Sequence, residues 1–335
     1  MSTDSRIQTR DHAPKAVVRN PKAVQAPSGG VWNYSHLEVP AYLMCPPFSF
    51  DTGQPNNIWM MDIPEQGRAV ERNKAFRQFQ ALYQFLSSRA FVQLLPVPGD
   101  CGLQDLVFTA NIGLVLEHLP ARDTVVISNY KSEPRIGETE VGVKFFQSMG
   151  YKTIVPTTKF EGEAELKHLH GNVYVGGYGL RSDRETYTQL EEQFGMKVIK
   201  VREHDPYLYH LDCTVFPLTD EKTIVCTEMF DRKEISEIER HTEVIDITRK
   251  EALPGLCNSV RLGNLILNGS NIHELARGSE AYKLELQKTR KLEDVATENG
   301  FEVALFNLSE YQKSGAALSC MVMHLNRASY KHRLL

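Results

Sequence analysis

Short apolar runs alternate along the chain with longer polar stretches in which apolar residues recur every three or four positions. The short runs are typical of buried strands, and the longer period is typical of amphipathic helices. This alternation predicts a mixed α/β fold. Strands are predicted within 105–117, 124–129, 172–179, 212–218 with 222–226, 259–268 and 319–325, and helices within 68–88, 138–150, 184–194, 233–240 and 282–300.

Several predicted strands come in pairs that are joined by a short polar turn and followed by a helix. In the clearest pair, 212–218 and 222–226 flank a Thr-Asp-Glu turn, and the helix 233–240 follows. The pattern indicates a recurring unit of a hairpin plus a helix. Sequence identity between the units is very low, so the pattern alone does not fix their number.

The first 37 residues differ from the rest of the chain. They are polar, lack a periodic apolar pattern, and contain Pro14, Pro21 and Pro27 before a Ser-Gly-Gly turn. Such a composition is typical of a flexible tail. We therefore expect a tail over 1–37 and a single catalytic domain over 38–335.

Composition narrows the class of partner. A chain of 335 residues with 41% hydrophobic residues can bury a large core. Its 38 basic and 42 acidic residues give a net charge of -4, which attracts neither nucleic acid nor an anionic membrane. The expected partner is a small molecule. The sequence is compatible with a homo-oligomer but does not determine the oligomeric state.

The cysteines and the apolar runs point to a compartment. No apolar run approaches the roughly 20 residues of a membrane-spanning helix, and the first residues lack the apolar core of a secretory signal. The six cysteines contain no Cys-x-x-Cys pair, which disfavours a disulfide framework and a thiolate zinc site. We expect reduced thiols and a cytoplasmic location.

Two segments could carry acid–base and nucleophilic chemistry. His210 and Asp212 lie two residues apart in 207-YLYHLDC-213, so in a strand they would point to one face. A histidine beside a carboxylate suits general acid–base catalysis, although a half-buried structural histidine fits the spacing as well. Cys320 follows small residues near the start of a predicted strand, where it is either a nucleophile or a core residue.

Acidic residues and one arginine complete the candidate set. Asp105 opens an apolar segment, and Glu161, Glu163 and Glu165 alternate with small residues. A carboxylate at the edge of a core is costly unless it meets a cation. We expect Asp105 and Glu165 to hold a positive group, and Glu161 and Glu163 to lie in a solvated loop. Arg181, after a glycine-rich turn, either clamps a carboxylate or pairs with a nearby surface acid.

These segments, taken in order, resemble the motifs of the pentein superfamily of guanidine-modifying enzymes. That superfamily includes arginine deiminase, dimethylarginine dimethylaminohydrolase, glycine amidinotransferase and the arginine dihydrolases. The resemblance covers most of residues 42–328. The matching segments are 44-MCPP-47 with 56-NNIWM-60, 104-QDLVFTAN-111, 135-RIGE-138, 161-EGEAE-165, 179-GLR-181, 210-HLD-212, 257-CNSV-260 and 319-SCM-321.

The resemblance implies a five-bladed α/β propeller of hairpin-plus-helix units around a central substrate site. It also implies roles for the residues that match. Cys320 corresponds to the nucleophile and His210 to the general acid and base. Glu165 and Asp105 correspond to partners of the guanidinium group, and Arg181 to the residue that binds the substrate α-carboxylate.

Two asparagines refine the expected activity. Asn111 stands where deiminases and dimethylaminohydrolases have a carboxylate, and Asn57 occupies a further pocket position; this pair looks like the arginine dihydrolases. Asp212 is expected to orient the histidine. The resemblance implies hydrolysis of arginine to ornithine, carbon dioxide and ammonia, without a metal or organic cofactor.

Alternative activities stay open from the sequence. A deiminase that stops at citrulline, a dimethylaminohydrolase and an amidinotransferase all share these motifs. From another class, His210 and Asp212 could join a distant His273 or His324 to bind iron in an oxygenase. The pair His168 and His170 has no evident third ligand, and no metal site is predicted there.

Overall fold

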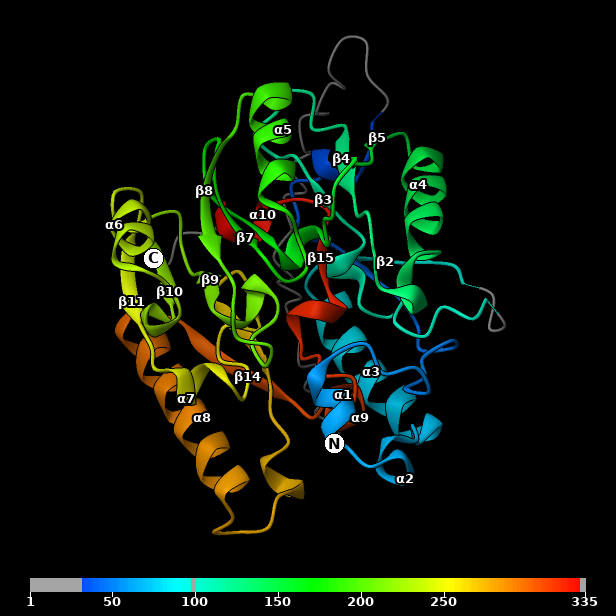
Figure 1. Ribbon diagram of the computed structural model, residues 1–335, viewed down its shortest axis with the longest axis vertical. Helices are drawn as coiled ribbons and strands as arrows, with labels where there is room; N and C mark the ends of the chain where they lie inside the picture. The colour runs from blue at the N-terminus through cyan, green and yellow to red at the C-terminus, as the bar shows by residue number, and fades with distance from the viewer. Residues whose placement is uncertain (1–31, 98–100, 332–335) are drawn as a thin grey trace, which may run out of the picture.

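The structure is a computed structural model that describes residues 32–97 and 101–331 (Figure 1). Within these residues the chain forms five sheets of three strands each. The sheets are β15(Met323–His324)-β1(Ala41–Met44)-β2(Phe91–Leu94), β3(Gly113–Val115)-β4(Thr124–Ile127)-β5(Lys152–Ile154), β6(Leu166–His170)-β7(Val173–Tyr178)-β8(Lys197–Arg202), β9(Val215–Pro217)-β10(Lys222–Val225)-β11(Glu243–Asp246) and β12(Ser259–Leu262)-β13(Leu265–Gly269)-β14(Glu302–Phe306).

Every sheet has the same topology. The first two strands pair antiparallel, a helix follows, and the third strand returns parallel to the middle one. The crossover helices lie around the outside of the molecule (Figure 1). They are α3(Arg72–Ser87), α4(Glu138–Ser148), α5(Arg184–Phe194), α6(Arg232–Glu239) and α8(Glu280–Glu298). This is the predicted five-bladed α/β propeller of hairpin-plus-helix units.

One blade is built from both ends of the described chain. β15 pairs antiparallel with β1, with Tyr42 opposite His324 and Leu43 opposite Met323. β1 then pairs parallel with β2. The propeller is therefore closed by main-chain hydrogen bonds between segments that are far apart in the sequence.

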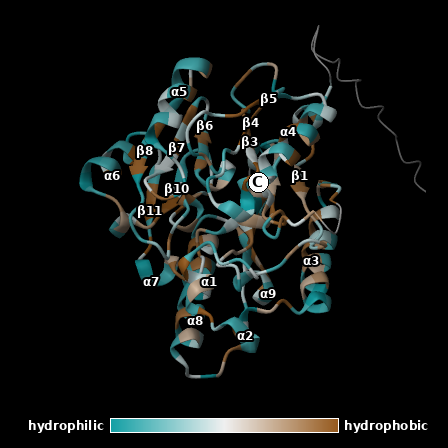
Figure 2. Cartoon of the chain, turned by 45° about the vertical axis from the view of Figure 1, so that its right-hand side comes forward, coloured by the Kyte–Doolittle hydropathy of each residue, from teal (hydrophilic) through white to brown (hydrophobic). Residues whose placement is uncertain are grey.

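Burial explains why the middle strands read as continuous apolar runs. Val125, Val126 and Ile127 of β4 are all fully buried, as are Ile224 and Val225 of β10. A strand covered on both faces needs apolar side chains at successive positions, not at alternate ones. Figure 2 shows these hydrophobic strands inside and the hydrophilic faces of the helices outside.

The five predicted helices are confirmed, but three predicted strands are partly wrong. Tight 3-10 turns occupy part of the segments predicted as strands over 105–117, 212–218 and 319–325. These turns are η2(Thr109–Asn111), η5(Leu211–Cys213) and η8(Ser319–Met321). All residues of these turns are buried except the half-buried Cys213. Burial demands apolar residues in either conformation, so the hydrophobic pattern could not distinguish turn from strand.

The expected tail boundary also differs from the structure. Asn33 and Ser35 are buried, and Asn33 caps the turn η1(Tyr34–His36). The Ser35 hydroxyl donates to the Leu325 carbonyl oxygen at 2.9 Å. Residues 33–37 therefore pack against the propeller, and residues 1–31 of the tail predicted over 1–37 lie outside the described residues.

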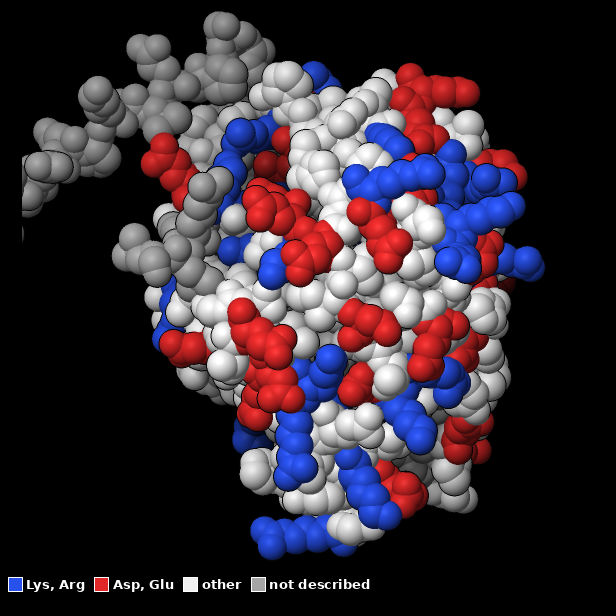
Figure 3. Space-filling model, turned by 90° about the vertical axis from the view of Figure 1, so that its left-hand side faces the viewer, with Lys and Arg blue, Asp and Glu red and all other residues white. Residues whose placement is uncertain are grey.

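The surface carries no dominant charge. Lys and Arg side chains are interspersed with Asp and Glu over the face shown in Figure 3, in keeping with the net charge of -4. Across the residues that the structure describes, no helix combines the length and apolar character needed to cross a membrane.

Candidate active site

The turns that precede the innermost strands bring the candidate residues together. Asn111 ends η2, Glu165 follows η4(Gly162–Ala164), Asp212 lies in η5 and Cys320 in η8. Asn258 directly precedes β12. Because each blade places its turn at the same end of its first strand, residues from five distant parts of the sequence converge on the propeller axis.

A cavity at this end contains most of the predicted site. Asn57, Asp105, Asn111, Arg181, His210 and Cys320 all line it, together with Asn56, Phe108, Arg135, Tyr209, Ser314 and Ala316. Of the predicted residues, Glu165 and Asp212 do not line this cavity. Glu165 instead lies beside His210, and Asp212 contacts Cys320. Among the described residues, no cluster of three or more potential metal ligands was found.

Cys320 is buried and makes two polar contacts. Its thiol donates to Asp212 Oδ2 at 3.5 Å, and Asn258 Nδ2 donates to its Sγ at 3.4 Å. Burial and the Asp212 carboxylate raise the pKa of the Cys320 thiol to about 12. The thiol is therefore protonated at neutral pH in the free protein, and a thiolate requires added positive charge in the cavity.

The predicted role of Asp212 beside His210 is not what the structure shows. Residues 211–213 form a 3-10 turn and not a strand, so the alternation of a strand does not place Asp212 beside His210. Asp212 Oδ2 instead accepts a hydrogen bond from Ser319 Oγ at 2.7 Å and lies against Cys320. The Asn258 contact was not predicted as part of the site, although its segment belonged to the motif pattern.

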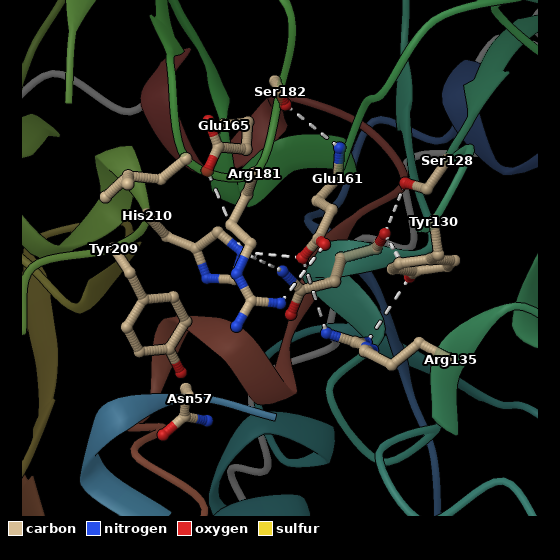
Figure 4. A network of polar contacts seen from close by, with 12 residues as sticks. Asn57, Ser128, Tyr130, Arg135, Glu161, Glu165, Arg181, Ser182, Tyr209 and His210 are labelled. Atoms are coloured by element: carbon tan, nitrogen blue, oxygen red, sulfur yellow. Dashed lines mark hydrogen bonds and ion pairs between the residues drawn. The ribbon is translucent and has the colours of Figure 1, made fainter. Parts of the chain in front are cut away.

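His210 is oriented by Glu161, which the sequence analysis wrongly placed in a solvated loop. His210 Nε2 donates to Glu161 Oε2 at 2.8 Å, and Glu165 Oε1 lies 3.8 Å from the same nitrogen (Figure 4). Burial lowers the pKa of His210, against the opposing effect of Glu161. The imidazole is therefore neutral at pH 7 and carries its proton on Nε2.

Glu161 is the centre of a charged network in Figure 4. Burial would raise its pKa, but Arg181 and His210 outweigh burial and lower it to about 2. Arg181 Nη1 lies 3.4 Å from Glu161 Oε1, and Arg135 Nη1 lies 3.9 Å from Glu161 Oε2. In the sequence, the neighbouring Gly162 is the residue that could have indicated the burial of Glu161. Its φ is +66°, and a Cβ there would lie 2.6 Å from the Ala110 carbonyl oxygen.

Arg181 and Asp105 line the cavity with opposite charges. Arg181 Nη2 donates to the Asn56 carbonyl oxygen at 2.8 Å, and its guanidinium lies over the Tyr209 ring at 4.9 Å. Asp105 Oδ2 accepts hydrogen bonds from Asn56 Nδ2 at 2.7 Å and Gln104 Nε2 at 3.2 Å. A cation and a carboxylate are thus both available to a zwitterionic ligand.

Glu163 is buried as well, which corrects the second solvated-loop prediction. Its Oε1 accepts from His324 Nδ1 at 2.5 Å, and its Oε2 from the His324 backbone N–H at 2.8 Å. Burial would raise the pKa of Glu163, but His324 lowers it to about 2. Glu163 therefore points away from the substrate cavity, toward a second cavity on the axis.

Glu165 faces another buried acid, Glu203. Burial and Glu203 raise the pKa of Glu165 well above its ordinary value, and burial raises the pKa of Glu203 to about 8. Among the described residues, none outside the pair donates a hydrogen bond to either carboxyl group. Two adjacent buried carboxyl groups cannot both ionise, so the pair holds a proton at neutral pH.

This pair predicts a pH-dependent stability. An unfolded glutamate has a pKa of about 4.3, whereas Glu203 in the fold titrates near 8. Between these values the folded protein retains a proton that the unfolded chain releases, so stability falls as pH rises from 5 to 8. We expect Glu203→Gln to flatten this fall in thermal denaturation. The exposed control Glu293→Gln should keep the wild-type slope; equal slopes in all three proteins would contradict the shared proton.

The fold and the site together define a class. A five-bladed α/β propeller that gathers a cysteine, a histidine, carboxylates and an arginine at its axis is a pentein. The chain belongs to the family described as N,N dimethylarginine dimethylhydrolase, eukaryotic, whose model matches residues 46–327.

Curated relatives include a bacterial bifunctional enzyme. The bifunctional arginine dihydrolase/ornithine cyclodeaminase AgrE of Nostoc sp. is 31% identical over 291 residues, which is 85% of this chain and 37% of that protein. The N(G),N(G)-dimethylarginine dimethylaminohydrolase of Mycobacterium tuberculosis is 30% identical over 185 residues, 55% of this chain and 57% of that one. The chain thus spans little more than a third of the length of AgrE.

Solved structures show the same fold. The N-terminal domain of ArgZ, an arginine dihydrolase from cyanobacteria bound to its product, has a TM-score of 0.73 at 26% identity. The match covers 86% of this chain and 98% of that domain. AgrE bound to L-arginine has the same TM-score at 28% identity, over 86% of this chain and 40% of AgrE.

Proposed function

We propose that this protein hydrolyses the guanidino group of arginine to ornithine, carbon dioxide and ammonia, with Cys320 as nucleophile and His210 as general acid and base. The observation that carries the proposal is the placement of Cys320, His210, Asn111 and Arg181 around one buried cavity. The similarity to arginine dihydrolases with bound arginine or product supports it. The chemistry uses no metal and no organic cofactor.

Charge explains how the first attack begins. A substrate guanidinium that faces Asp105 brings a cation next to Cys320, and this cation lowers the cost of forming the thiolate. The Cys320 thiol passes its proton to the neutral His210, and the resulting thiolate attacks the guanidinium carbon. The protonated His210 then gives that proton to the departing nitrogen, which leaves as ammonia. The product is an amidino group bound to sulfur. Arg181 holds the α-carboxylate of the substrate.

Water completes the reaction in two rounds. His210 accepts a proton from water as the oxygen attacks the sulfur-bound carbon, and breakage of the C–S bond gives citrulline. In the second round Cys320 attacks the ureido carbon and expels a second ammonia. Hydrolysis of the resulting thiocarbamate releases a carbamate, which decomposes to ornithine and carbon dioxide.

The family match favours a second candidate substrate. Its description names dimethylarginine, whose hydrolysis would release dimethylamine and stop at citrulline. Asn111 distinguishes the two activities, because an amide can face a neutral ureido oxygen and keep citrulline bound for the second round. A carboxylate at this position would only accept hydrogen bonds and would repel that oxygen.

Product analysis tests the assignment. The purified protein should convert arginine to ornithine and ammonia, convert added citrulline at a measurable rate, and show no transfer of the amidino group to glycine or lysine. Citrulline as the only stable product would reject the dihydrolase activity. Turnover of dimethylarginine in place of arginine would establish the second candidate.

Arg181→Ala should separate arginine from agmatine, which lacks the α-carboxylate. Loss of a charge-assisted bidentate contact costs roughly 2–3 kcal/mol, so we expect kcat/KM for arginine to fall about 100-fold and that for agmatine to change little. The exposed Arg290→Ala serves as control. Equal losses on both substrates would reassign Arg181 to the support of Glu161.

We further propose that residues 32–331 form one catalytic domain and that the protein works in the cytoplasm. All six cysteines are free thiols, as expected in a reducing compartment. A measurement of mass in solution will show whether the domain acts as a monomer or as a homo-oligomer.

A further inference from the structure

A small second cavity lies on the propeller axis, behind the turn that carries Cys320. All five innermost strands, β3, β6, β9, β12 and β15, contribute to its lining. Ser319 forms part of its wall, whereas the adjacent Cys320 lines the substrate cavity. One turn thus separates the two cavities, and we call the second one the axial cavity.

The axial cavity presents unpartnered hydrogen-bond acceptors. His168 Nε2 contacts the Gly171 carbonyl oxygen at 2.7 Å and must carry the proton there, so its Nδ1 is a bare acceptor. His324 also lines the cavity and contacts Glu163 through Nδ1. Within the described part of the chain, His168 Nδ1 and Glu117 Oε1 are buried without a hydrogen-bond partner. Such groups favour an occupant that donates hydrogen bonds.

Size and charge define the occupant. The cavity offers about 30 Å³ to the centres of water-sized molecules, which suffices for one or two of them. Lys167 and Arg327 line it beside Glu117 and Glu163, so the charged side chains of the wall are balanced in number. The site therefore suits a small hydrogen-bond donor such as water or ammonia.

The axial cavity adjoins an open vestibule on the far side of the propeller. Glu117, His168 and Arg327 line both spaces, and His170 lines only the vestibule. On the other side, Ser319 Oγ is hydrogen-bonded to Asp212, which in turn contacts Cys320. Ser319 is the residue at which a small molecule would pass between the reacting sulfur and this route.

We propose that the axial cavity is an ammonia site, through which the nitrogen expelled at Cys320 leaves while the rest of the substrate still fills the front of the site. The inference rests on the proposed hydrolysis, which releases ammonia beside Cys320 and needs the organic product to stay bound between the two rounds. A rear exit allows both.

The reverse step provides the assay. Ammonia that enters through the axial cavity attacks the sulfur-bound amidino carbon, the C–S bond breaks, Cys320 leaves as thiolate, and the excess proton passes to His210. The product is arginine that contains the added nitrogen. We therefore expect arginine recovered during turnover in ¹⁵N-ammonium chloride to contain ¹⁵N, in an amount that rises with the free-base fraction as pH increases.

Variants of the wall test the route. His168→Phe keeps a ring against Tyr174 but removes the acceptor, and we expect about 10-fold less ¹⁵N incorporation per turnover. Glu117→Leu removes a second acceptor and serves if the first variant folds poorly. His170→Phe, on the same strand but outside the axial cavity, is the matched control and should behave as wild type.

The outcomes separate the two proposals. Unchanged ¹⁵N incorporation in both wall variants, or equal loss in the His170→Phe control, would overturn the ammonia site and leave the cavity to water. Incorporation that follows total ammonium and not its free base would also overturn it. Absence of ammonia release by the wild type would reject the proposed function itself.

Discussion

Replacement of Cys320 by alanine should abolish turnover of arginine and leave the fold intact. The thiol is the one nucleophilic sulfur in the cavity lining, and its contacts with Asp212 and Asn258 are the weak ones of a sulfur atom. We expect kcat to fall by about 10⁴-fold or more, as for removal of other enzyme nucleophiles. Steady-state assays with arginine measure the loss, and circular dichroism checks the fold.

A second buried cysteine provides the control. Cys226 is fully buried in a hydrophobic cluster and does not line the substrate cavity. Cys226→Ala should lower thermal stability slightly and retain most of the activity. A Cys320→Ala protein that kept more than a few per cent of wild-type turnover would reject the cysteine mechanism.

Replacement of Asn111 by aspartate should change the product. Asn111 Nδ2 lies 3.4 Å from His210 Nε2, but that nitrogen already carries the proton that Glu161 accepts. The amide N–H therefore has little hydrogen-bond energy to gain from His210 in this orientation. The side chain can turn either its oxygen or its nitrogen toward a ligand. A carboxylate lacks the donor, so citrulline should leave after the first round, and the ratio of citrulline to ornithine should rise at least 10-fold.

The assay for this prediction follows both products with time, starting from arginine and separately from citrulline. Asn111→Asp should consume arginine yet leave citrulline untouched. Asn264→Asp, which adds the same charge at an exposed hairpin turn, should retain the wild-type product. Ornithine formed from citrulline by Asn111→Asp at the wild-type rate would disprove the role of the amide.

The sequence predicted the helices well because amphipathic periodicity survives wherever a helix covers one side of a sheet. The helix 184–194 was predicted with its observed bounds. The turns at the axis were misread as strands because burial imposes the same apolar composition on both. The same error affected the predicted role of Asp212. The direction of its side chain depends on whether residues 211–213 form a strand or a 3-10 turn.

The roles of Glu161 and Glu163 could not be predicted from local sequence. Alternating acids beside glycine are typical of a solvated loop, and only tertiary contacts reveal that one acid meets His210 and the other meets His324. Gly162 was the local clue, since its positive φ lets the neighbouring turn approach closely. Long-range charge pairs of this kind leave no periodic signal in the sequence.

The pairing of β15 with β1 ties activity to the order of translation. During translation β1 is synthesised early, and it stays without its antiparallel partner β15 until the segment that contains Cys320 has been synthesised. A nascent chain interrupted before Ser319 lacks both the closing strand and Cys320. Premature termination therefore removes in one step the strand that closes the propeller and the cysteine proposed to react with the substrate.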